Sequence, residues 1–591
     1  MDTNQRLAAL RIVMKKNAID AIIIPSSDPH QSEYVAAHWQ ERAWISGFTG
    51  SAGIAAVTMD HAGLWTDSRY FLQGEMQLKG TEVVLHKMYN QFASPYVDFL
   101  TTALPSGSTV AINGMMFSKV AVDGIKKILA SAGIDLVHRI DLISQVWGDR
   151  PGLSNSPAMF HEDKYSGKSM EQKLKEVRAN MIDKNADHHF ITALDDLAWT
   201  FNMRGQDVDY NPVTIAYAIV GKSDVQLFVN KEKLSDALKK ELAKNSVVIH
   251  GYDTILDFLN QMNEKDSILV DLNIISQTLY EAINAKVITG SSIPKELKAI
   301  KNETEIGHIW SVMKKDGAAL AHTFYWLEQK LRQKEQIDEV AVARKLAENR
   351  SFQKFYQGES FGAIVGYKDN GAIIHYHPEP ATCKTIQPEG ILLVDSGGQY
   401  CDGTTDITRT FALSPPTDEQ KKAYTLILKG MIALSRAKFP EGTAGAQLDT
   451  LARQFLWAEG MNYGHGTGHG VGFFLNVHEP PQGFAPVHSE RGRTVHLPGM
   501  LTSNEPGYYK EGEYGMRIEN LILAVKSDTS GFMEFETVTL YPFEHTLIDK
   551  SRLTKEEISW INMYHKKVYS GISPILKGEI KEWFKEKCRK V

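Results

Sequence analysis

The chain has 591 residues, more than one hydrophobic core usually serves, and this length indicates about three or four domains. Its composition, 43% hydrophobic and 23% charged residues, is that of an ordinary soluble globular protein. The net charge of -6 argues against nucleic acid as the main partner. No apolar run approaches the roughly 18 residues that a membrane span needs, so no membrane partner is expected.

The cysteines and the N-terminus indicate a cytoplasmic protein. Cys383, Cys401 and Cys588 are too few and too irregularly spaced for a zinc ribbon or a disulfide framework. An odd, small number of cysteines fits a reducing compartment and free thiols, although Cys383 and Cys401 flank a predicted strand and are candidates for close neighbours. Residues 1–16 have the pattern of an amphipathic helix, not of a signal peptide.

Strands and helices alternate in the first part of the chain. Residues 18–24 form an apolar run that ends at Pro25 and predicts a buried strand. Residues 64–71 predict a strand that ends at polar residues and leads into a helix. The glycine-rich stretch 44–51 lacks the layout of a phosphate-binding loop and indicates tight turns. We therefore predict an α/β domain over residues 1–155.

The same pattern recurs after a linker at residues 150–157. A helix from Met170 leads to a predicted strand at residues 189–194. The second copy shares two further segments with the first: residues 196–205 resemble residues 42–50, and residues 224–230 resemble residues 61–67. We interpret residues 156–299 as a diverged duplicate of the first domain.

A third unit, residues 300–591, carries the candidate chemistry. Asn302 and Glu305 have the spacing of a capping box, and they predict the start of a long helix that continues through Lys330. Every candidate metal ligand lies after this helix. The first two domains are therefore expected to shape or restrict the site and not to perform the reaction.

Two aspartates lie on neighbouring segments of this third unit. Asp395 ends the apolar run that begins at Ile391, and Asp406 opens the alternating segment that ends at Ala412. If these segments are adjacent antiparallel strands, both carboxylates come within reach of one metal pair. Alone, each aspartate would more simply be a turn residue or a helix cap.

Later motifs supply further ligands. His465 and His469 lie among glycines, which disfavour a helix and favour an extended segment with both rings on one side. Glu505 precedes Pro506 and is predicted at a strand end. Glu519 is predicted on a strand face beside Arg517, which would then orient a ligating carboxylate. A surface salt bridge is the simpler alternative for Glu519 alone.

Together these residues have the composition of a two-metal hydrolytic site. The metal set is Asp395, Asp406, His469, Glu505 and Glu519. Its four carboxylates balance two divalent cations, and its oxygen-rich character suits hard ions, most simply Mn²⁺, with Co²⁺ or Zn²⁺ as alternatives.

The ordered ligand set, with gaps of 11, 63, 36 and 14 residues, resembles the "pita-bread" metallopeptidases, which include methionine aminopeptidase, prolidase and aminopeptidase P. The segments His465-Gly-Thr-Gly-His469 and Asn504-Glu-Pro-Gly507 carry this resemblance. Residues 23–34, 65–72 and 553–562 also resemble the long, three-domain Xaa-Pro aminopeptidases. The implied fold class is α/β (α+β): two related creatinase-like α/β domains and a C-terminal pita-bread catalytic domain.

The resemblance implies an activity and residue roles. The expected reaction removes an N-terminal residue from peptides with proline second, using two Mn²⁺ ions in a cytoplasmic homodimer. Asp406, Glu505 and Glu519 would touch or bridge both metals. The residues expected to contact the peptide are Arg69, His375, His465, His469, His478 and Glu505. Of these, Glu505, His375 and His478 are the expected catalytic residues.

A mechanism follows as a hypothesis. The two metals lower the pKa of a shared water, Glu505 accepts its proton and passes it to the proline nitrogen, and His478 or His375 helps the metals to stabilise the oxyanion. We expect His465 to line a small pocket for proline.

Four other kinds of pita-bread protein are the alternatives. Prolidase shares the metals and the proline preference but cleaves dipeptides and usually has one N-terminal domain. Methionine aminopeptidase would not need the first 300 residues. Non-enzymatic pita-bread binding modules, and creatinases that use the fold without metals, lose ligands that this chain keeps.

Overall fold

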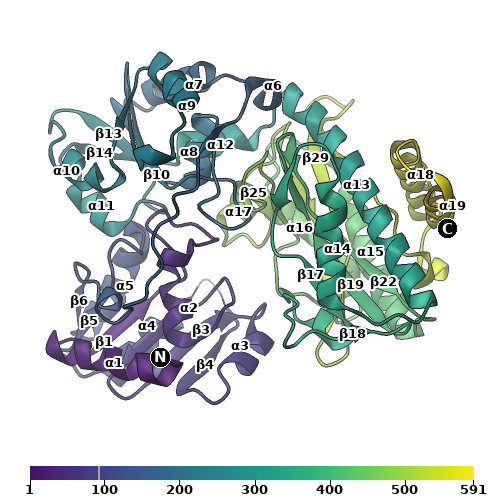
Figure 1. The fold of residues 1–591 in the computed structure, drawn as a ribbon, viewed down its shortest axis with the longest axis horizontal. Coiled ribbons are helices and arrows are strands. Elements are labelled where there is room, and N and C mark those ends of the chain that lie inside the picture. The colour runs from purple at the N-terminus through teal and green to yellow at the C-terminus, as the bar shows by residue number, and fades with distance from the viewer. Residues whose placement is uncertain (91–92) are drawn as a thin grey trace. The chain divides into compact units, whose positions relative to one another are not determined.

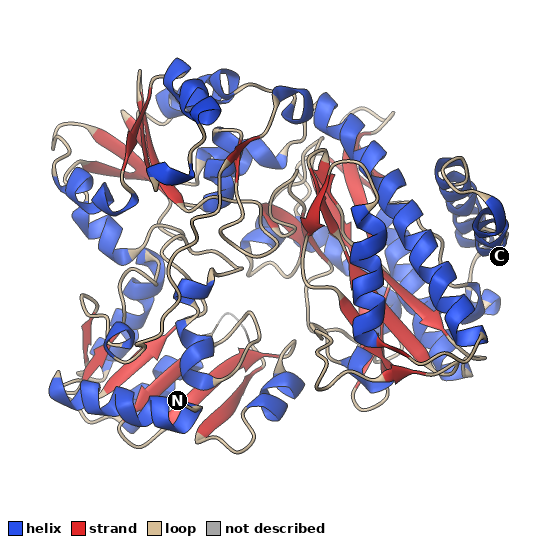
Figure 2. Cartoon of the chain, in the orientation of Figure 1, coloured by secondary structure: helices blue, strands red, loops and turns tan. Residues whose placement is uncertain are grey.

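The computed structural model describes residues 1–90 and 93–591, which form two compact units. The first unit comprises Met1–His161 and Lys168–Glu296, and the second comprises Glu162–Gly167 and Leu297–Val591. Both units combine helices with strands, as Figure 2 shows.

The first sheet of the first unit has the strand order β4-β3-β2-β1-β5-β6. Strand β1 pairs parallel with β5 and antiparallel with β2, while β3 pairs parallel with β4. Apolar residues of α1, such as Leu7 and Leu10, pack with Ile22 and Ile24 of β1, so the predicted N-terminal amphipathic helix and buried strand are confirmed. The elements are α1 (Thr3–Lys16), β1 (Ala21–Ile24), α2 (Glu41–Ser46), β2 (Ile54–Thr58), β3 (Ala62–Asp67), α3 (Phe71–Gln77), β4 (Val83–Met88), α4 (Pro95–Ala103), β5 (Thr109–Ala111), α5 (Lys119–Ser131) and β6 (Asp135–Val137).

The second sheet repeats this plan in the order β12-β11-β10-β8-β13-β14. Strand β8 pairs parallel with β13 and antiparallel with β10, and β11 pairs parallel with β12, as their counterparts do in the first sheet. Strands β11 and β3 occupy equivalent places, which agrees with the predicted resemblance of residues 224–230 to residues 61–67. The elements are β7 (Met159–Phe160), α7 (Met170–Asp183), β8 (His188–Ile191), α8 (Leu194–Thr200), β9 (Met203–Arg204), β10 (Ala216–Gly221), β11 (Val225–Val229), α9 (Asp236–Lys244), β12 (Val247–His250), α10 (Ile255–Asn260), β13 (Ser267–Val270), α11 (Gln277–Ala282) and β14 (Lys286–Thr289).

The duplication predicted from the sequence is therefore confirmed by strand order and orientation. One boundary was wrong: the strand predicted at residues 189–194 ends at Ile191, and Leu194 already begins α8. Helix α12 (Ile293–Ala299) then crosses from the first unit into the second.

Helices α13 to α16 of the second unit pack against its strands (Figure 1). Helix α13 begins as predicted, because the Asn302 side chain accepts a hydrogen bond from the Glu305 backbone while the Glu305 side chain accepts one from the Asn302 backbone. The helices are α6 (Asp163–Ser166), α13 (Glu303–Arg332), α14 (Glu339–Ser351), α15 (Asp418–Ser435), α16 (Gly445–Trp457), α17 (Glu490–Arg493), α18 (Lys555–Ile572) and α19 (Gly578–Lys587).

Two sheets of the second unit position the candidate ligands. One has the order β17-β19-β22, and the other has the order β23-β30-β29-β26-β24-β25. The strands are β15 (Ile337–Asp338), β16 (Tyr356–Glu359), β17 (Ile364–Tyr367), β18 (Thr385–Ile386), β19 (Ile391–Ser396), β20 (Gly398–Tyr400), β21 (Gly403–Thr404), β22 (Ile407–Ala412), β23 (Lys438–Pro440), β24 (Gly468–Gly470), β25 (Glu479–Phe484), β26 (Leu501–Asn504), β27 (Gly507–Lys510), β28 (Tyr514–Arg517), β29 (Asn520–Lys526) and β30 (Phe532–Thr537).

Two expectations about the whole chain can be compared with this structure. Cys383, Cys401 and Cys588 are free, as expected. Across residues 1–90 and 93–591, no helix combines the length and the apolar character needed to cross a membrane.

Candidate metal centre

Strands β19 and β22 bring the two aspartates together. They pair antiparallel with Asp395 opposite Thr408, and Asp406 lies one residue before β22, so the predicted strand pair is confirmed. A Cβ at Gly397 would lie 2.0 Å from the Thr405 carbonyl oxygen, so only glycine allows the chain to approach itself so closely after Asp395. Both carboxylates are buried.

His469 lies on the short strand β24 between β25 and β26. Its Nδ1 lies 3.0 Å from the Gly470 carbonyl oxygen, which fixes the proton on Nδ1 and leaves the Nε2 lone pair available. Nε2 is 3.5 Å from both Asp406 Oδ2 and Glu505 Oε1. The neighbouring glycines have a steric reason, since a Cβ at Gly468 would lie 1.9 Å from the Ser503 carbonyl oxygen.

The two glutamates lie in short segments between strands. Glu505 follows β26 directly, as predicted, and its backbone N–H donates to the Thr467 carbonyl at 2.8 Å. Glu519 was predicted on one strand face with Arg517, and this was wrong. Strand β28 ends at Arg517 and pairs with β27, whereas β29 starts at Asn520 in another sheet. Glu519 therefore lies in the short connection between these two strands. There its carboxylate accepts the Thr408 hydroxyl at 2.8 Å.

The five predicted ligands form one cluster. Ligand atoms of Asp406, His469 and Glu519 all lie within 4.8 Å of one another. Two ligands that share a divalent ion at about 2.1 Å each are at most about 4.2 Å apart, so the 3.5 Å separations around His469 fit a common ion. Glu505 belongs to the cluster through His469, and Asp395 acts electrostatically on Asp406, Glu505 and Glu519.

Electrostatics show what the cluster lacks. Burial, followed by the charge of Glu519, raises the pKa of Asp406 well above its usual range. Burial and the Glu505 charge do the same to the pKa of Glu519. Burial raises the pKa of Glu505 to about 7, although Arg517 opposes this shift. Such repulsion among buried carboxylates is relieved by bound cations.

Unsatisfied ligand atoms support the same conclusion. Asp395 Oδ1 and Glu519 Oε1 are buried without a hydrogen-bond partner in the described part of the chain. Buried carboxylate oxygens are normally satisfied, so these two fit coordination to a metal. Four carboxylates and one imidazole thus match the donor set for two divalent ions.

Arg517 orients two of the ligands. Its Nη2 donates to Asp395 Oδ2 at 2.7 Å, so Arg517 does pair with a ligand carboxylate, although the sequence did not indicate which one. Its Nε donates to the Thr408 hydroxyl at 3.1 Å, and that hydroxyl in turn donates to Glu519. Thr408 carried no signal in the sequence, because its role depends on the pairing of β19 with β22.

The predicted histidines lie at different places. The His478 ring is 4.2 Å from the His469 ring, centroid to centroid, and contributes to the electrostatics of Glu505. His465 lies outside β24, so the predicted continuous extended segment was too long. Its Nε2 is 2.9 Å from the Tyr509 hydroxyl, which also accepts Arg517 Nη1 at 2.5 Å. Because Tyr509 then donates to His465, the His465 proton lies on Nδ1, which is 2.7 Å from the Gly466 carbonyl.

One histidine was missed, and one predicted residue, Arg69, belongs to the first unit. Desolvation by surrounding groups lowers the pKa of His377, and the charge of Asp395 opposes this shift, which ties His377 to the metal centre. The same His-Tyr-His motif contains His375, which is half-buried and whose predicted role stays a prediction. Arg69 belongs to the first unit and donates to both carboxylate oxygens of Asp67, at 2.8 and 2.7 Å.

Models of known families cover nearly the whole chain. The creatinase/prolidase N-terminal domain matches residues 6–143, and a second model of that domain matches residues 149–305. Metallopeptidase family M24 matches residues 308–526, and the C-terminal region of peptidase M24 matches residues 531–591.

Whole-chain relatives agree with these models. The chain is 40% identical to a probable Xaa-Pro aminopeptidase P of Coprinopsis cinerea over 99% of this chain and 98% of the relative. It is 42% identical to the probable Xaa-Pro aminopeptidase P of Botryotinia fuckeliana over 98% of this chain and 91% of that protein. This chain belongs to the aminopeptidase P family of M24 metallopeptidases.

A solved structure extends the similarity to three dimensions. The X-prolyl aminopeptidase of Caenorhabditis elegans, described as a cytosolic enzyme with a di-nuclear active site, matches with a TM-score of 0.95. It is 32% identical, and the match covers 100% of both chains. The predicted architecture of two creatinase-like domains and a pita-bread domain is thereby confirmed for this aminopeptidase P family member.

Proposed function

We propose that this protein is a metal-dependent exopeptidase that cleaves the bond between an N-terminal residue and a penultimate proline. The observation that carries the proposal is the cluster of Asp395, Asp406, His469, Glu505 and Glu519, of which all but the half-buried Glu505 are buried. The relatives that match the chain from end to end are named Xaa-Pro aminopeptidase P, which supports the proline preference.

The cluster would hold two divalent ions. The oxygen-rich donor set favours Mn²⁺, with Co²⁺ and Zn²⁺ as alternatives. When bound, such ions lower the pKa of a shared water and polarise the carbonyl of the scissile bond. All five residues would hold the ions as ligands.

Glu505 is proposed to move the proton. It accepts a proton as the water oxygen adds to the carbonyl carbon, and it donates that proton to the proline nitrogen as the C–N bond breaks. The Ser503 hydroxyl donates to Glu505 Oε1 at 3.3 Å and so helps to orient the carboxylate. The proton removed from water therefore leaves with the departing peptide, and atoms and charge balance over the cycle.

The surrounding residues are proposed to bind the peptide. His478 lies beside His469, so it is a candidate to donate to the developing oxyanion, and His375 is the alternative. His465, held by Tyr509, is proposed to line the proline pocket. Arg69 is proposed to contact the substrate, in keeping with the family resemblance.

Location and assembly belong to the same proposal. The C. elegans relative is described as cytosolic, and the three cysteines of this chain are free. We propose a cytoplasmic homodimer of chains built from domains at residues 1–155, 156–299 and 300–591.

A peptide panel tests the proposal against prolidase. The Mn²⁺-loaded protein is given Xaa-Pro-Yaa tripeptides, Xaa-Pro dipeptides and Xaa-Ala-Yaa tripeptides, and kcat/KM is measured for each. We expect cleavage of Xaa-Pro-Yaa at the first bond and little cleavage of Xaa-Ala-Yaa. A preference for the dipeptide would replace the assignment with prolidase.

Metal analysis tests the alternative of a non-catalytic binding module. We expect about two equivalents of divalent metal per chain by elemental analysis after dialysis against Mn²⁺. A protein that neither retains metal nor is activated by it would favour the binding module.

A further inference from the structure

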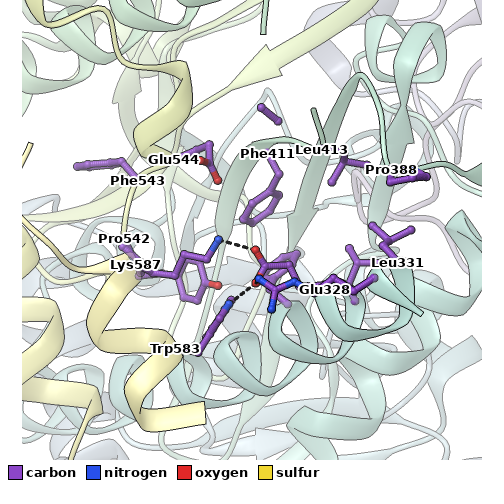
Figure 3. Close-up of a pocket in the computed structure, with 15 residues that line it drawn as sticks. Glu328, Leu331, Pro388, Phe411, Leu413, Pro542, Phe543, Glu544, Trp583 and Lys587 are labelled. Carbon is purple, nitrogen blue, oxygen red and sulfur yellow. Dashed lines mark hydrogen bonds and ion pairs between the residues drawn. The ribbon is translucent and has the colours of Figure 1, made fainter. Parts of the chain in front are cut away.

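A cavity lies in the second unit, apart from the metal ligands. Its volume is about 250 Å³, and none of the five proposed ligands lines it. Helix α13 contributes Leu327 and Leu331, β22 contributes Phe411, and the segment after β30 contributes Tyr541 and Phe543. Figure 3 shows labelled side chains of these elements around one space.

The charged side chains around this cavity are already matched. Glu328 accepts a hydrogen bond from the Trp583 indole N–H and one from Lys587 Nζ at 2.8 Å, both from α19 (Figure 3). Arg332 Nη2 lies 3.9 Å from the same carboxylate. The remaining charge, Glu544, accepts from Thr546 at the start of a short helical turn. Two acids and two bases therefore leave no excess charge to attract an ionic ligand.

One polar group in the wall lacks a partner. Tyr541 is 2% exposed, yet its hydroxyl makes no hydrogen bond to any residue that the structure describes. Its ring packs 5.6 Å from Phe324, centroid to centroid. The hydroxyl is not among the fully buried polar atoms without a partner, so it is open to the cavity, where a ligand can hydrogen-bond to it.

The cavity wall is joined to the metal centre by Arg409. This buried side chain donates through Nε to the Pro542 carbonyl at 3.0 Å and through Nη2 to the Tyr541 carbonyl at 2.6 Å. Its Nη1 donates to the backbone carbonyl of Glu519 at 2.5 Å. The guanidinium carbon also lies 5.0 Å from the Phe543 ring centroid. A shift of residues 541–543 would therefore move Arg409 and, through it, the backbone of the proposed ligand Glu519.

We propose that this cavity binds a neutral, mostly aromatic small molecule with one hydrogen-bonding group for Tyr541, and that Arg409 couples its occupancy to the metal centre. A 250 Å³ space suits a molecule of about 10–15 non-hydrogen atoms, since an apolar cavity of about 150 Å³ holds benzene. The aromatic and aliphatic wall supplies contact area, and Tyr541 fixes orientation.

Binding is tested by calorimetry on the full chain without peptide. Biphenyl-4-carboxamide is compared with biphenyl-4-carboxylate and with the ammonium of biphenyl-4-methylamine. We expect one site per chain and at least about tenfold tighter binding of the carboxamide than of either ion. Absence of carboxamide binding at millimolar concentration would overturn the proposal, as would equal affinity for all three probes.

Two variants place the binding in this cavity. Leu413→Trp fills the space and should abolish binding, whereas Met563→Trp, at a position of α18 that is 61% exposed, should leave it unchanged. Tyr541→Phe keeps the ring and should weaken carboxamide binding about tenfold. Because Tyr541→Phe removes only one hydroxyl, it still tests the proposal if Leu413→Trp does not fold. Unchanged affinity in Tyr541→Phe would show that the carboxamide binds elsewhere.

The coupling is tested by the same titration with and without Mn²⁺. A coupled site should show at least about a fivefold difference in carboxamide dissociation constant between the metal-free and Mn²⁺-loaded protein. Equal constants would overturn the role of Arg409. Because no peptide is present, failure of the proline-directed peptidase assignment would not change these outcomes.

Discussion

Two groups of buried acids, one in each unit, differ in how their charge is compensated. In the first unit, Asp207 lies 2.5 Å from Lys233 Nζ and Asp271 lies 3.1 Å from Lys295 Nζ, and all four side chains are buried. In the second unit, Asp406, Glu505 and Glu519 face one another, and each has a raised pKa. The paired acids are compensated by their lysines, whereas a group of acids without enough cations suits the binding of metal ions.

This difference separates structure from chemistry within one chain. The lysine-paired acids lie in or beside the duplicated sheet. There each ion pair has no net charge, and the attraction between its partners offsets the free energy of desolvation. The repelling acids destabilise the metal-free protein, so the strands that carry them must be held by other packing. Removing a lysine that pairs with a buried acid should therefore lower the free energy of unfolding. Removing one of the repelling carboxylates should raise it in the metal-free protein.

The largest effect is expected for Glu505→Gln in the loaded enzyme. Loss of the proton carrier should lower kcat about 10³-fold, equivalent to about 4 kcal/mol of transition-state stabilisation. Steady-state cleavage of an Xaa-Pro-Yaa peptide measures this, with circular dichroism to confirm folding. The matched control is Glu513→Gln, at an exposed glutamate in the turn between β27 and β28. Near-normal kcat in Glu505→Gln would remove the residue from its proposed role.

The next effect concerns the first unit and should change the stability of the protein but not its catalytic chemistry. Lys233→Met leaves the Asp207 carboxylate buried and unpaired, which should cost about 3–4 kcal/mol in the free energy of unfolding. Urea unfolding followed by fluorescence measures the loss, and Lys231→Met, in the same turn but exposed, is the control. Equal denaturation midpoints for both variants would mean that the pair contributes nothing, and the contrast with the metal centre would disappear.

A change of sign is expected when Glu505→Gln is studied without metal. Burial raises the pKa of Glu505 from 4.5 to about 7, so between these pH values the native state holds a proton that the unfolded chain has released. The free energy of unfolding of the metal-free wild type therefore falls as pH rises through this window. At pH 8 the Gln variant should be more stable by up to about 3 kcal/mol, and at pH 4 this advantage should be absent.

Denaturant midpoints of EDTA-treated protein at pH 4, 6 and 8 measure this effect. Mn²⁺ should reverse the order at pH 8, because the wild type binds the ions more tightly and binding stabilises the native state. A metal-free Gln variant that is less stable than wild type at pH 8 would contradict the repulsion described above.

Local signals were sufficient for much of the site. The capping box at Asn302 and Glu305 fixes where α13 begins, because both partners lie within one turn of helix. The apolar run before Asp395 and the alternation after Asp406 predicted a strand pair, because a sheet with a buried face requires those patterns. The repeated strand order of the first unit was likewise visible as weak similarity between segments.

Features that depend on tertiary contacts were not predictable. Glu519 resembles a strand residue, yet the chain changes sheets between Arg517 and Asn520, and only the packing of β28 and β29 determines this break. His465 resembles His469 in its glycine-rich setting, but Tyr509, 44 residues away, holds it outside the strand. Thr408 and the cavity at Tyr541 had no local pattern, since each depends on segments far apart in the sequence.

The smallest effect is expected for Arg517, the cation that pairs with an acid of the metal centre. Arg517 is a buried cation paired with the proposed ligand Asp395, and it reaches Glu519 through Thr408. Lysine keeps the charge but offers a single nitrogen in place of the guanidinium fork that donates to Asp395, Thr408 and Tyr509. Arg517→Lys should therefore weaken Mn²⁺ binding about 10- to 100-fold, or about 1.4–2.8 kcal/mol, because orientation is lost while charge compensation stays.

Competition for Mn²⁺ with a chelating indicator measures this affinity, and Arg436→Lys, at an exposed arginine after α15, is the control. If Arg517 contributed charge alone, Arg517→Lys would bind Mn²⁺ like wild type and only Arg517→Met would be weakened. Wild-type affinity in both variants would show instead that the carboxylates need no oriented partner. The geometry around Asp395 predicts neither outcome, since three separate donors of Arg517 each hold a different acceptor in place.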